Sequence, residues 1–149
     1  IFSRPVKEFY ILQQWLMDWA KYLLRENQFN PSSLPHYKQG DLIRVDFGWR
    51  IGREFGGIHY AIVAEKNNNP RNSMIFLIPI SSYDFGEKIH HNDVDLGTCI
   101  NNKLSFAVLT QTGAYSKMRI LNNRIYGRLP SSTMNKILSK IALRFGIKK

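Results

Sequence analysis

The chain has 149 residues, enough for one hydrophobic core with an appendage and too few for two ordinary domains. It carries a net charge of +10, and its 44% hydrophobic content is sufficient for it to fold unaided. The single cysteine, Cys99, excludes an internal disulfide, and no apolar run approaches the roughly 20 residues of a membrane span. We therefore expect a cytoplasmic protein without a transmembrane segment.

An amphipathic helix is predicted over residues 4–27, followed by a linker. Its apolar side chains recur at spacings of three and four: Phe9, Leu12, Leu16, Trp19 and Leu23, with Trp15, Tyr22 and Leu24 widening the stripe. Ser3 and Pro5 are typical of a helix start, and Asn27 to Pro31 of a stop. We interpret residues 1–35 as a helical extension followed by a linker. We expect the apolar stripe of this helix to be buried against the rest of the chain, in a dimer interface or on a partner protein.

A strand, a glycine-rich loop and a second strand are predicted over residues 40–63. Apolar and polar residues alternate from Leu42 to Phe47, which indicates a strand with one mostly polar face. The loop glycines are Gly52, Gly56 and Gly57, which allow conformations that a Cβ would penalise. The loop also carries Arg53 and Glu54, and His59 begins the second strand. This combination indicates either a chemical site or a hairpin with solvated charges and a hydrogen-bonded histidine.

The remaining chain is predicted to form further strands and a closing helix. Strands are predicted at residues 59–65, 74–80, 104–112 and 124–129, with a turn at 67–70 and a long loop over 83–95. A helix capped by Ser131 or Ser132 and closed by Gly146 carries apolar residues at helical spacing.

Positive charge is concentrated in the last third of the chain. No Asp or Glu follows Asp95, whereas ten Lys or Arg do. A one-sided field of this kind attracts polyanions and speeds their encounter. It favours a nucleic-acid partner, with a generally basic surface or an acidic protein partner as the alternatives.

A series of short motifs begins in the first predicted hairpin. It comprises Gly40-Asp41 with Val45-Asp46-Phe47, Glu54 with Gly56-Gly57, His59 to Val63, Arg71-Asn72-Ser73, and Ile78 to Ser81. In this order the motifs resemble the PemK/MazF family, small toxin endoribonucleases of toxin–antitoxin pairs, over residues 38–146. The resemblance implies an α+β, mostly β fold: a small SH3-like barrel over residues 36–149 with a C-terminal helix. The N-terminal amphipathic helix is then an addition to the family core.

The resemblance also implies a chemistry. Family members cut RNA without metal: a ribose 2′-hydroxyl attacks the adjacent phosphate and leaves a cyclic phosphate and a 5′-hydroxyl. His59 stands where the usual pattern has a catalytic arginine, and Ser81 stands where it has a catalytic threonine. Serine keeps the hydroxyl, whereas histidine exchanges a permanent cation for a group that titrates near neutrality.

The candidate catalytic residues are His59, Ser81, Glu54 and Arg53. Cleavage needs a base near the 2′-oxygen, an acid for the leaving oxygen and positive charge on the phosphate. His59 is suited to act as base or acid, and Ser81 is suited to donate to the phosphate. Arg53, or Arg50, would supply fixed charge, and Glu54 would orient His59 or act as the base itself. Spacing alone does not separate these roles.

RNA contacts are predicted at Arg50 and in a segment that matches a basic segment of the family. This segment runs from Gln111 to Arg119 and includes Lys117. Lys117 and Arg119 are expected to contact phosphates, and Gln111 is expected to contact RNA.

No metal ion and no cofactor is predicted. His90 to Asp95 combine imidazoles and carboxylates, but no second cluster completes a metal shell. The glycines of residues 52–57 lack the Lys-Ser/Thr pair of a phosphate-binding loop.

The function indicated is a metal-independent endoribonuclease that acts on single-stranded RNA. The resemblance implies a cognate antitoxin and a homodimer as partners. One alternative is a barrel of the same fold that has lost catalysis and binds RNA or protein as a regulator. A DNA-binding module is a further alternative, which rests on charge alone.

Overall fold

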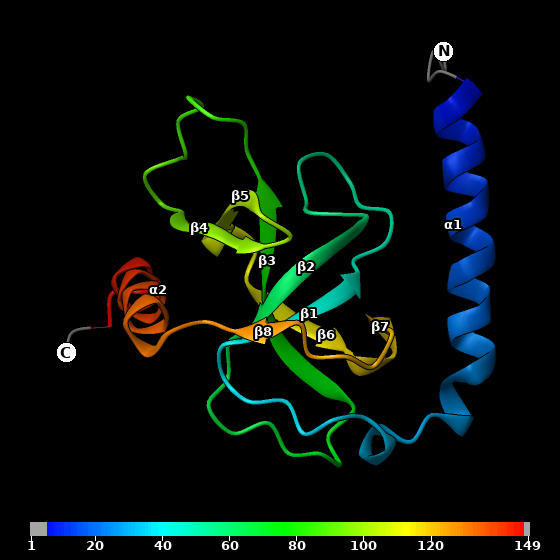
Figure 1. The fold of residues 1–149 in the computed structure, drawn as a ribbon. Coiled ribbons are helices and arrows are strands. Elements are labelled where there is room, and N and C mark those ends of the chain that lie inside the picture. The colour runs from blue at the N-terminus through cyan, green and yellow to red at the C-terminus, as the bar shows by residue number, and fades with distance from the viewer. Residues whose placement is uncertain (1–5, 148–149) are drawn as a thin grey trace.

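A computed structural model describes residues 6–147 as an antiparallel sheet with an α-helix on each side (Figure 1). The helices are α1 (Val6–Arg25) and α2 (Ser131–Arg144), and the strands are β1 (Asp41–Asp46), β2 (Ile58–Val63), β3 (Met74–Ser82), β4 (Val94–Ile100), β5 (Lys103–Ala107), β6 (Gly113–Ser116), β7 (Ile120–Leu121) and β8 (Gly127–Arg128). Short 3₁₀ turns lie at Glu26–Gln28, Pro31–Ser33, Leu109–Gln111 and Lys117–Arg119. Within residues 6–147, no helix has the length and apolar composition needed to cross a membrane.

The long strand β3 connects the parts of the sheet. The strand order is β4-β5-β3-β2-β1-β7, with β6 paired to β3 and β8 paired to β1, and every pairing is antiparallel. The first part of β3 pairs with β2 and β6, and from Ile80 onward it pairs with β5. The predicted fold, mostly β with a helix before and after the sheet, is confirmed.

Apolar side chains form a core on each face of the sheet. Leu42 belongs to the core that includes Met134 and Ile137 of α2, whereas Ile43 and Val45 belong to the core on the other face. Successive strand residues point to opposite faces, so β1 contributes to both cores. The face predicted to be mostly polar carries Arg44 and Asp46, which are partly exposed, whereas its one apolar member, Leu42, is buried with α2.

Several predicted boundaries also differ from the structure. The strand predicted over 104–112 ends at Ala107, where the chain turns into a 3₁₀ segment, and the predicted loop over 83–95 ends at Val94 with β4. No side-chain hydrogen bond caps α2, whose N-cap position is Pro130, so the predicted serine cap is wrong. The predicted helix start at Ser3 and Pro5 lies outside the described residues.

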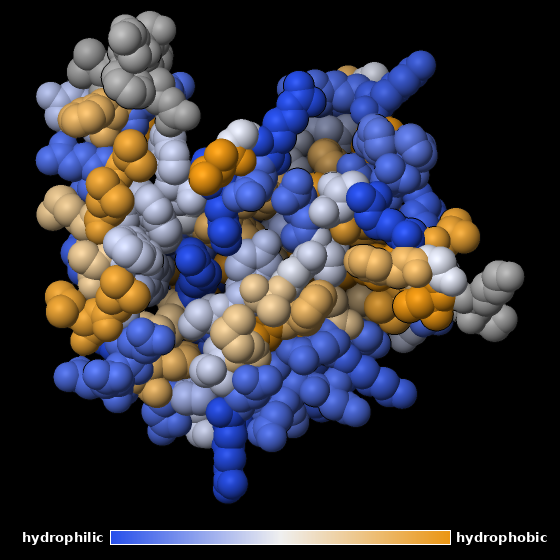
Figure 2. Space-filling model, turned by 180° about the vertical axis from the view of Figure 1, so that it is seen from behind, coloured by the Kyte–Doolittle hydropathy of each residue, from blue (hydrophilic) through white to orange (hydrophobic). Residues whose placement is uncertain are grey.

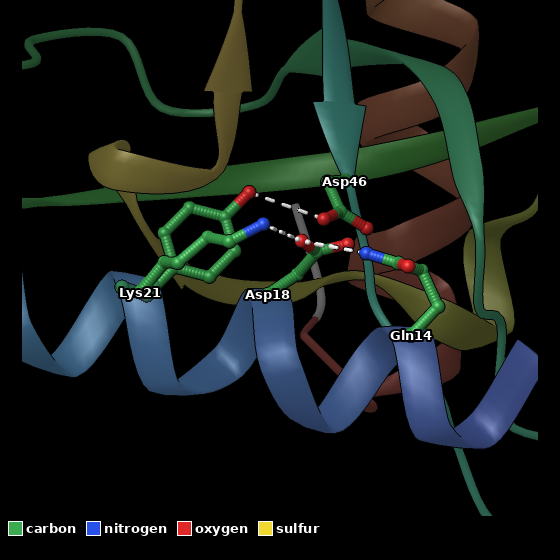
Figure 3. A network of polar contacts seen from close by, with 5 residues as sticks. Gln14, Asp18, Lys21 and Asp46 are labelled. Atoms are coloured by element: carbon green, nitrogen blue, oxygen red, sulfur yellow. Dashed lines mark hydrogen bonds and ion pairs between the residues drawn. The ribbon is translucent and has the colours of Figure 1, made fainter.

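Helix α1 touches the sheet along a narrow strip. The Tyr22 hydroxyl donates to an Asp46 carboxylate oxygen at 3.1 Å, and the Arg119 guanidinium lies over the Trp15 ring at 5.5 Å. Close by on α1, the Asp18 carboxylate accepts from Gln14 at 3.2 Å and from Lys21 at 2.9 Å (Figure 3). These contacts hold the helix beside the loop that follows β1.

Much of the predicted apolar stripe of α1 is exposed. The exposed members are Phe9, Leu16, Trp19, Leu23 and Leu24, with exposed fractions from 48% for Trp19 to 81% for Leu24. Figure 2 shows hydrophobic side chains gathered along the side of α1 that faces away from the sheet. The expectation that the chain buries this stripe against itself holds for Leu12, Trp15 and Tyr22, which are partly buried, and fails for the exposed members.

Replacing Gly48 by alanine is expected to loosen α1. A Cβ at Gly48 would lie 2.4 Å from the Trp15 ring, and Gly48 has a φ of +73°. We expect Gly48→Ala to lower the free energy of unfolding by about 1–3 kcal/mol more than Gly52→Ala, the range typical of overpacking. Gly52 is the matched control, because it has a φ of +61° and open space around it. Urea unfolding and limited proteolysis of α1 measure the effect, and equal losses in the two variants would contradict it.

Candidate functional site

His59 and Ser81 lie near the point where β2 and β3 separate. The β2–β3 pairing ends at Ala61 opposite Pro79. His59 precedes the last paired residue of β2 by two positions, and Ser81 follows the last paired residue of β3 by two positions, so both lie just beyond the paired part of these strands. Beyond Pro79, β3 pairs with β5, so the strands diverge there. The structure therefore brings together the two residues that the resemblance singles out.

A cavity of about 250 Å³ occupies this divergence. His59, Ser81 and Ser82 line it, together with Tyr60, Asn101, Lys103 and Ser105. The lining thus combines residues that carry hydroxyl, amide, imidazole and ammonium groups with three isoleucines, Ile58, Ile80 and Ile100. A cavity with converging polar side chains is the usual form of a binding or catalytic site.

His59 is half-buried against an aromatic ring. The ring centroids of Phe55 and His59 lie 4.4 Å apart. Burial lowers the pKa of His59 below its ordinary value of 6.5, and a weaker hydrogen bond to the Gly56 backbone acts in the opposite direction. His59 is therefore mainly neutral at neutral pH. A neutral imidazole can accept a proton, but it supplies no fixed positive charge.

The loop before β2 is fastened at its base. The Phe47 amide donates to the Gly57 carbonyl at 2.8 Å, and the Gly57 amide donates to the Gly48 carbonyl at 2.8 Å. A Cβ at Gly56 would lie 2.7 Å from the Gly48 carbonyl oxygen, so this position requires glycine. The close approach of the two loop ends fixes where Phe55 and His59 enter the site.

Gln111 holds this loop from the other side. Its side-chain oxygen accepts from the Phe55 amide at 3.4 Å, and its side-chain nitrogen donates to the Arg53 carbonyl at 3.5 Å. The predicted RNA-binding amide is therefore occupied by the protein in this structure. The Arg53 side chain is exposed and is not among the residues that line the His59 cavity.

Glu54 and Arg50 line a different cavity. This cavity, of about 490 Å³, lies between α1 and the loop, with Trp15 and Trp49 in its wall. The Arg50 side chain donates to the Phe47 carbonyl at 2.8 Å. Neither Glu54 nor Arg50 lines the cavity of His59 and Ser81, so the structure does not bring the five predicted residues into one site.

Lys117 and Arg119 are engaged within the protein. Lys117 is 2% exposed, and its ammonium group donates to the Asn69 carbonyl at 3.0 Å. Arg119 donates to the Asp46 carbonyl at 3.2 Å. The burial of Lys117 argues against the predicted phosphate contact, because an ammonium at this site reaches a ligand only if it gives up its carbonyl partner.

Sequence reasoning missed the residues that β5 and the preceding turn bring to the cavity. Asn101 and Lys103 both line it, and the Asn101 side-chain nitrogen donates to the Tyr60 hydroxyl at 3.1 Å. Asn101 and Asn102 have φ values of 50° and 55°, as in a tight hairpin turn. This Asn-Asn pair was the available sequence signal, since asparagine tolerates a positive φ better than most residues.

The histidine and carboxylate segment after β3 forms no metal centre in the part of the chain that the structure describes. His90 and His91 lie in a turn, with ring centroids 4.3 Å apart. Across residues 6–147 no group of three or more His, Cys, Asp or Glu side chains is placed to hold a metal ion.

Comparison with known proteins assigns the chain to a family. Residues 38–145 match the family described as PemK-like, MazF-like toxin of type II toxin-antitoxin system. No curated protein matches the chain in sequence.

Solved structures resemble about three quarters of the chain. MazF from Deinococcus radiodurans has 17% identity and a TM-score of 0.61, with 76% of this chain and 97% of that chain covered. An endoribonuclease in complex with its cognate antitoxin from a mycobacterial species has 16% identity and a TM-score of 0.57, with coverages of 76% and 98%. Mycobacterium tuberculosis toxin MazF-mt6 has 13% identity and a TM-score of 0.56, with coverages of 73% and 99%. These likenesses support the fold, and because the family match spans most of its length, the chain belongs to the PemK-like, MazF-like toxins of type II toxin–antitoxin systems.

Proposed function

We propose that this protein is an endoribonuclease that cleaves single-stranded RNA without a metal ion. The observation that carries the proposal is that His59 and Ser81 line one cavity. These two residues stand where the family resemblance expects the catalytic pair. Family membership supports the reaction class, and the basic last third of the chain supports a polyanionic substrate.

The lowered pKa of His59 favours the role of general base. His59 takes the proton of the ribose 2′-hydroxyl, and the 2′-oxygen forms a bond to phosphorus. The bond from phosphorus to the 5′-oxygen then breaks. The products are a 2′,3′-cyclic phosphate and, after protonation of the leaving oxygen, a 5′-hydroxyl. Ser81 donates a hydrogen bond to a phosphate oxygen as negative charge develops there.

The partners proposed are a cognate antitoxin protein and a second copy of the chain, in the cytoplasm. A similar mycobacterial endoribonuclease is described in complex with its cognate antitoxin, and D. radiodurans MazF is described in complexes with MazE. Extending this to the present chain, an acidic antitoxin segment would be attracted by the same positive field as RNA.

A cleavage assay on a long single-stranded RNA in excess EDTA tests the proposal. We expect discrete cuts whose downstream fragments carry a 5′-hydroxyl. An otherwise identical RNA with a 2′-deoxy sugar at the cut site should resist cleavage, because the attacking oxygen is missing. Cuts that need a divalent metal, or that leave a 5′-phosphate, would contradict the mechanism. Salt-sensitive RNA binding without any cutting would instead favour a regulator that has lost catalysis.

A further inference from the structure

The His59 cavity needs a source of fixed positive charge. A phosphodiester carries one negative charge and gains more as the 2′-oxygen attacks. Burial keeps His59 mainly neutral, and the arginines predicted to compensate, Arg53 and Arg50, are absent from the residues that line the cavity. A partly enclosed site makes a nearby cation more effective than one in open solvent.

Lys103 is the one cationic side chain among the described residues that line this cavity. It is exposed, and within residues 6–147 its ammonium group forms no ion pair and no hydrogen bond. Lys117, by contrast, is buried and bonded to a carbonyl. Lys103 is therefore free to bind an anion without breaking an existing contact.

The backbone of Lys103 is held at the rim of the cavity. Lys103 begins β5 directly after the tight turn at Asn101 and Asn102, and it pairs with Ile100 of β4. The turn is attached to β2 by the hydrogen bond from Asn101 to the Tyr60 hydroxyl, one residue after His59. The hairpin thus holds the Lys103 backbone at the cavity, and the flexible lysine stem is free to bring its ammonium group to a bound phosphate.

We propose that Lys103 is a catalytic residue that binds the scissile phosphate and neutralises its charge during cleavage. It would supply the permanent cation that the family places at the position of His59. The proposal rests on the proposed function, and it adds a residue from β5 to the pair on β2 and β3.

Single-turnover cleavage by three variants tests this assignment. We expect Lys103→Met to lower the cleavage rate by about 10²–10³-fold, the range seen when one donor to a developing oxyanion is removed. Lys103→Arg should recover a large part of the rate, because it keeps the charge. Lys136→Met is the matched control: Lys136 is an exposed lysine of α2 and does not line the cavity, so its loss should change the rate less than about threefold. Equal rates for Lys103→Met and Lys136→Met would overturn the proposal.

A binding assay separates failure of this proposal from failure of the proposed function. A single-stranded oligonucleotide with 2′-deoxy sugars retains the phosphates but cannot be cleaved. We expect Lys103→Met to weaken its binding and to reduce the slope of log affinity against log salt by about one contact, whereas Lys103→Arg keeps the slope. If the wild-type protein binds RNA but never cuts it, the proposed nuclease activity is refuted. The salt slopes of the wild type and Lys103→Met would still show whether Lys103 binds a phosphate. Identical slopes for wild type and Lys103→Met would overturn that role.

Discussion

Replacing His59 by alanine is expected to lower RNA cleavage by about 10²–10⁴-fold, the contribution typical of one proton-transfer group. RNA affinity should change far less, because a mainly neutral imidazole adds little to phosphate binding. Single-turnover rates with excess protein measure the first effect, and fluorescence anisotropy with an uncleavable RNA measures the second. His91→Ala is the matched control, since His91 is exposed in a turn and lies outside the cavity.

The pH profile distinguishes a base from an acid at the same residue. Burial lowers the pKa of His59, so the limb that it produces lies below pH 6.5. If neutral His59 is the base, the rate rises with pH through that limb and is flat from about pH 7 to 8. A rate that falls as pH rises through this limb would assign His59 as the acid. A rate flat from pH 5 to 8, with binding intact, would remove His59 from proton transfer altogether.

Replacing Phe47 by alanine is expected to lower the free energy of unfolding by about 3–5 kcal/mol, as for other buried aromatic side chains. Phe47 is fully buried, and its ring packs edge-on against Phe55 at 5.5 Å and Tyr115 at 4.9 Å between centroids. The substitution removes both contacts and leaves a cavity beneath the loop. Urea denaturation measures the loss. Phe76→Ala is the control, because Phe76 is 46% exposed and should cost much less.

Phe47→Ala is also expected to disturb the His59 cavity, because Phe47 contacts Phe55. Phe55 packs on both Phe47 and His59, so a cavity at Phe47 removes one of the two supports of the ring that covers the histidine. We expect cleavage by Phe47→Ala to fall even at temperatures where the variant stays folded, with a smaller loss for the volume-conserving Phe47→Leu. Full activity of folded Phe47→Ala would show that the Phe55 contact does not position His59.

Resemblance in sequence was sufficient to single out the pair at the centre of the site. His59 follows the Gly56-Gly57 motif and Ser81 ends the Ile78 to Ser81 motif, and both residues line one cavity in the structure. The supporting residues were harder to predict. Arg50, Glu54 and Gln111 have the right chemistry in or near the right loop, yet their side chains serve the loop or line the neighbouring cavity. Residue type does not determine which way a loop side chain points.

The sequence by itself determined the elements whose signal is local. Alternation predicted β1, runs of β-favouring residues predicted β2 and β3, and helical spacing predicted α1 and α2, because these signals are set by residues that are close along the chain. The one-sided charge was likewise readable without a structure.

Only the tertiary structure decided which charged and apolar groups are free. The ammonium of buried Lys117 donates to the carbonyl of Asn69, 48 residues away. Lys103 is exposed and lines the same cavity as His59, because the β4–β5 hairpin is attached to Tyr60 of β2. Leu16 and Trp15 both belong to the predicted apolar stripe of α1, yet Leu16 is exposed and Trp15 packs beside Gly48. Which of these side chains is buried depends on contacts between distant segments, and local sequence patterns do not predict such contacts.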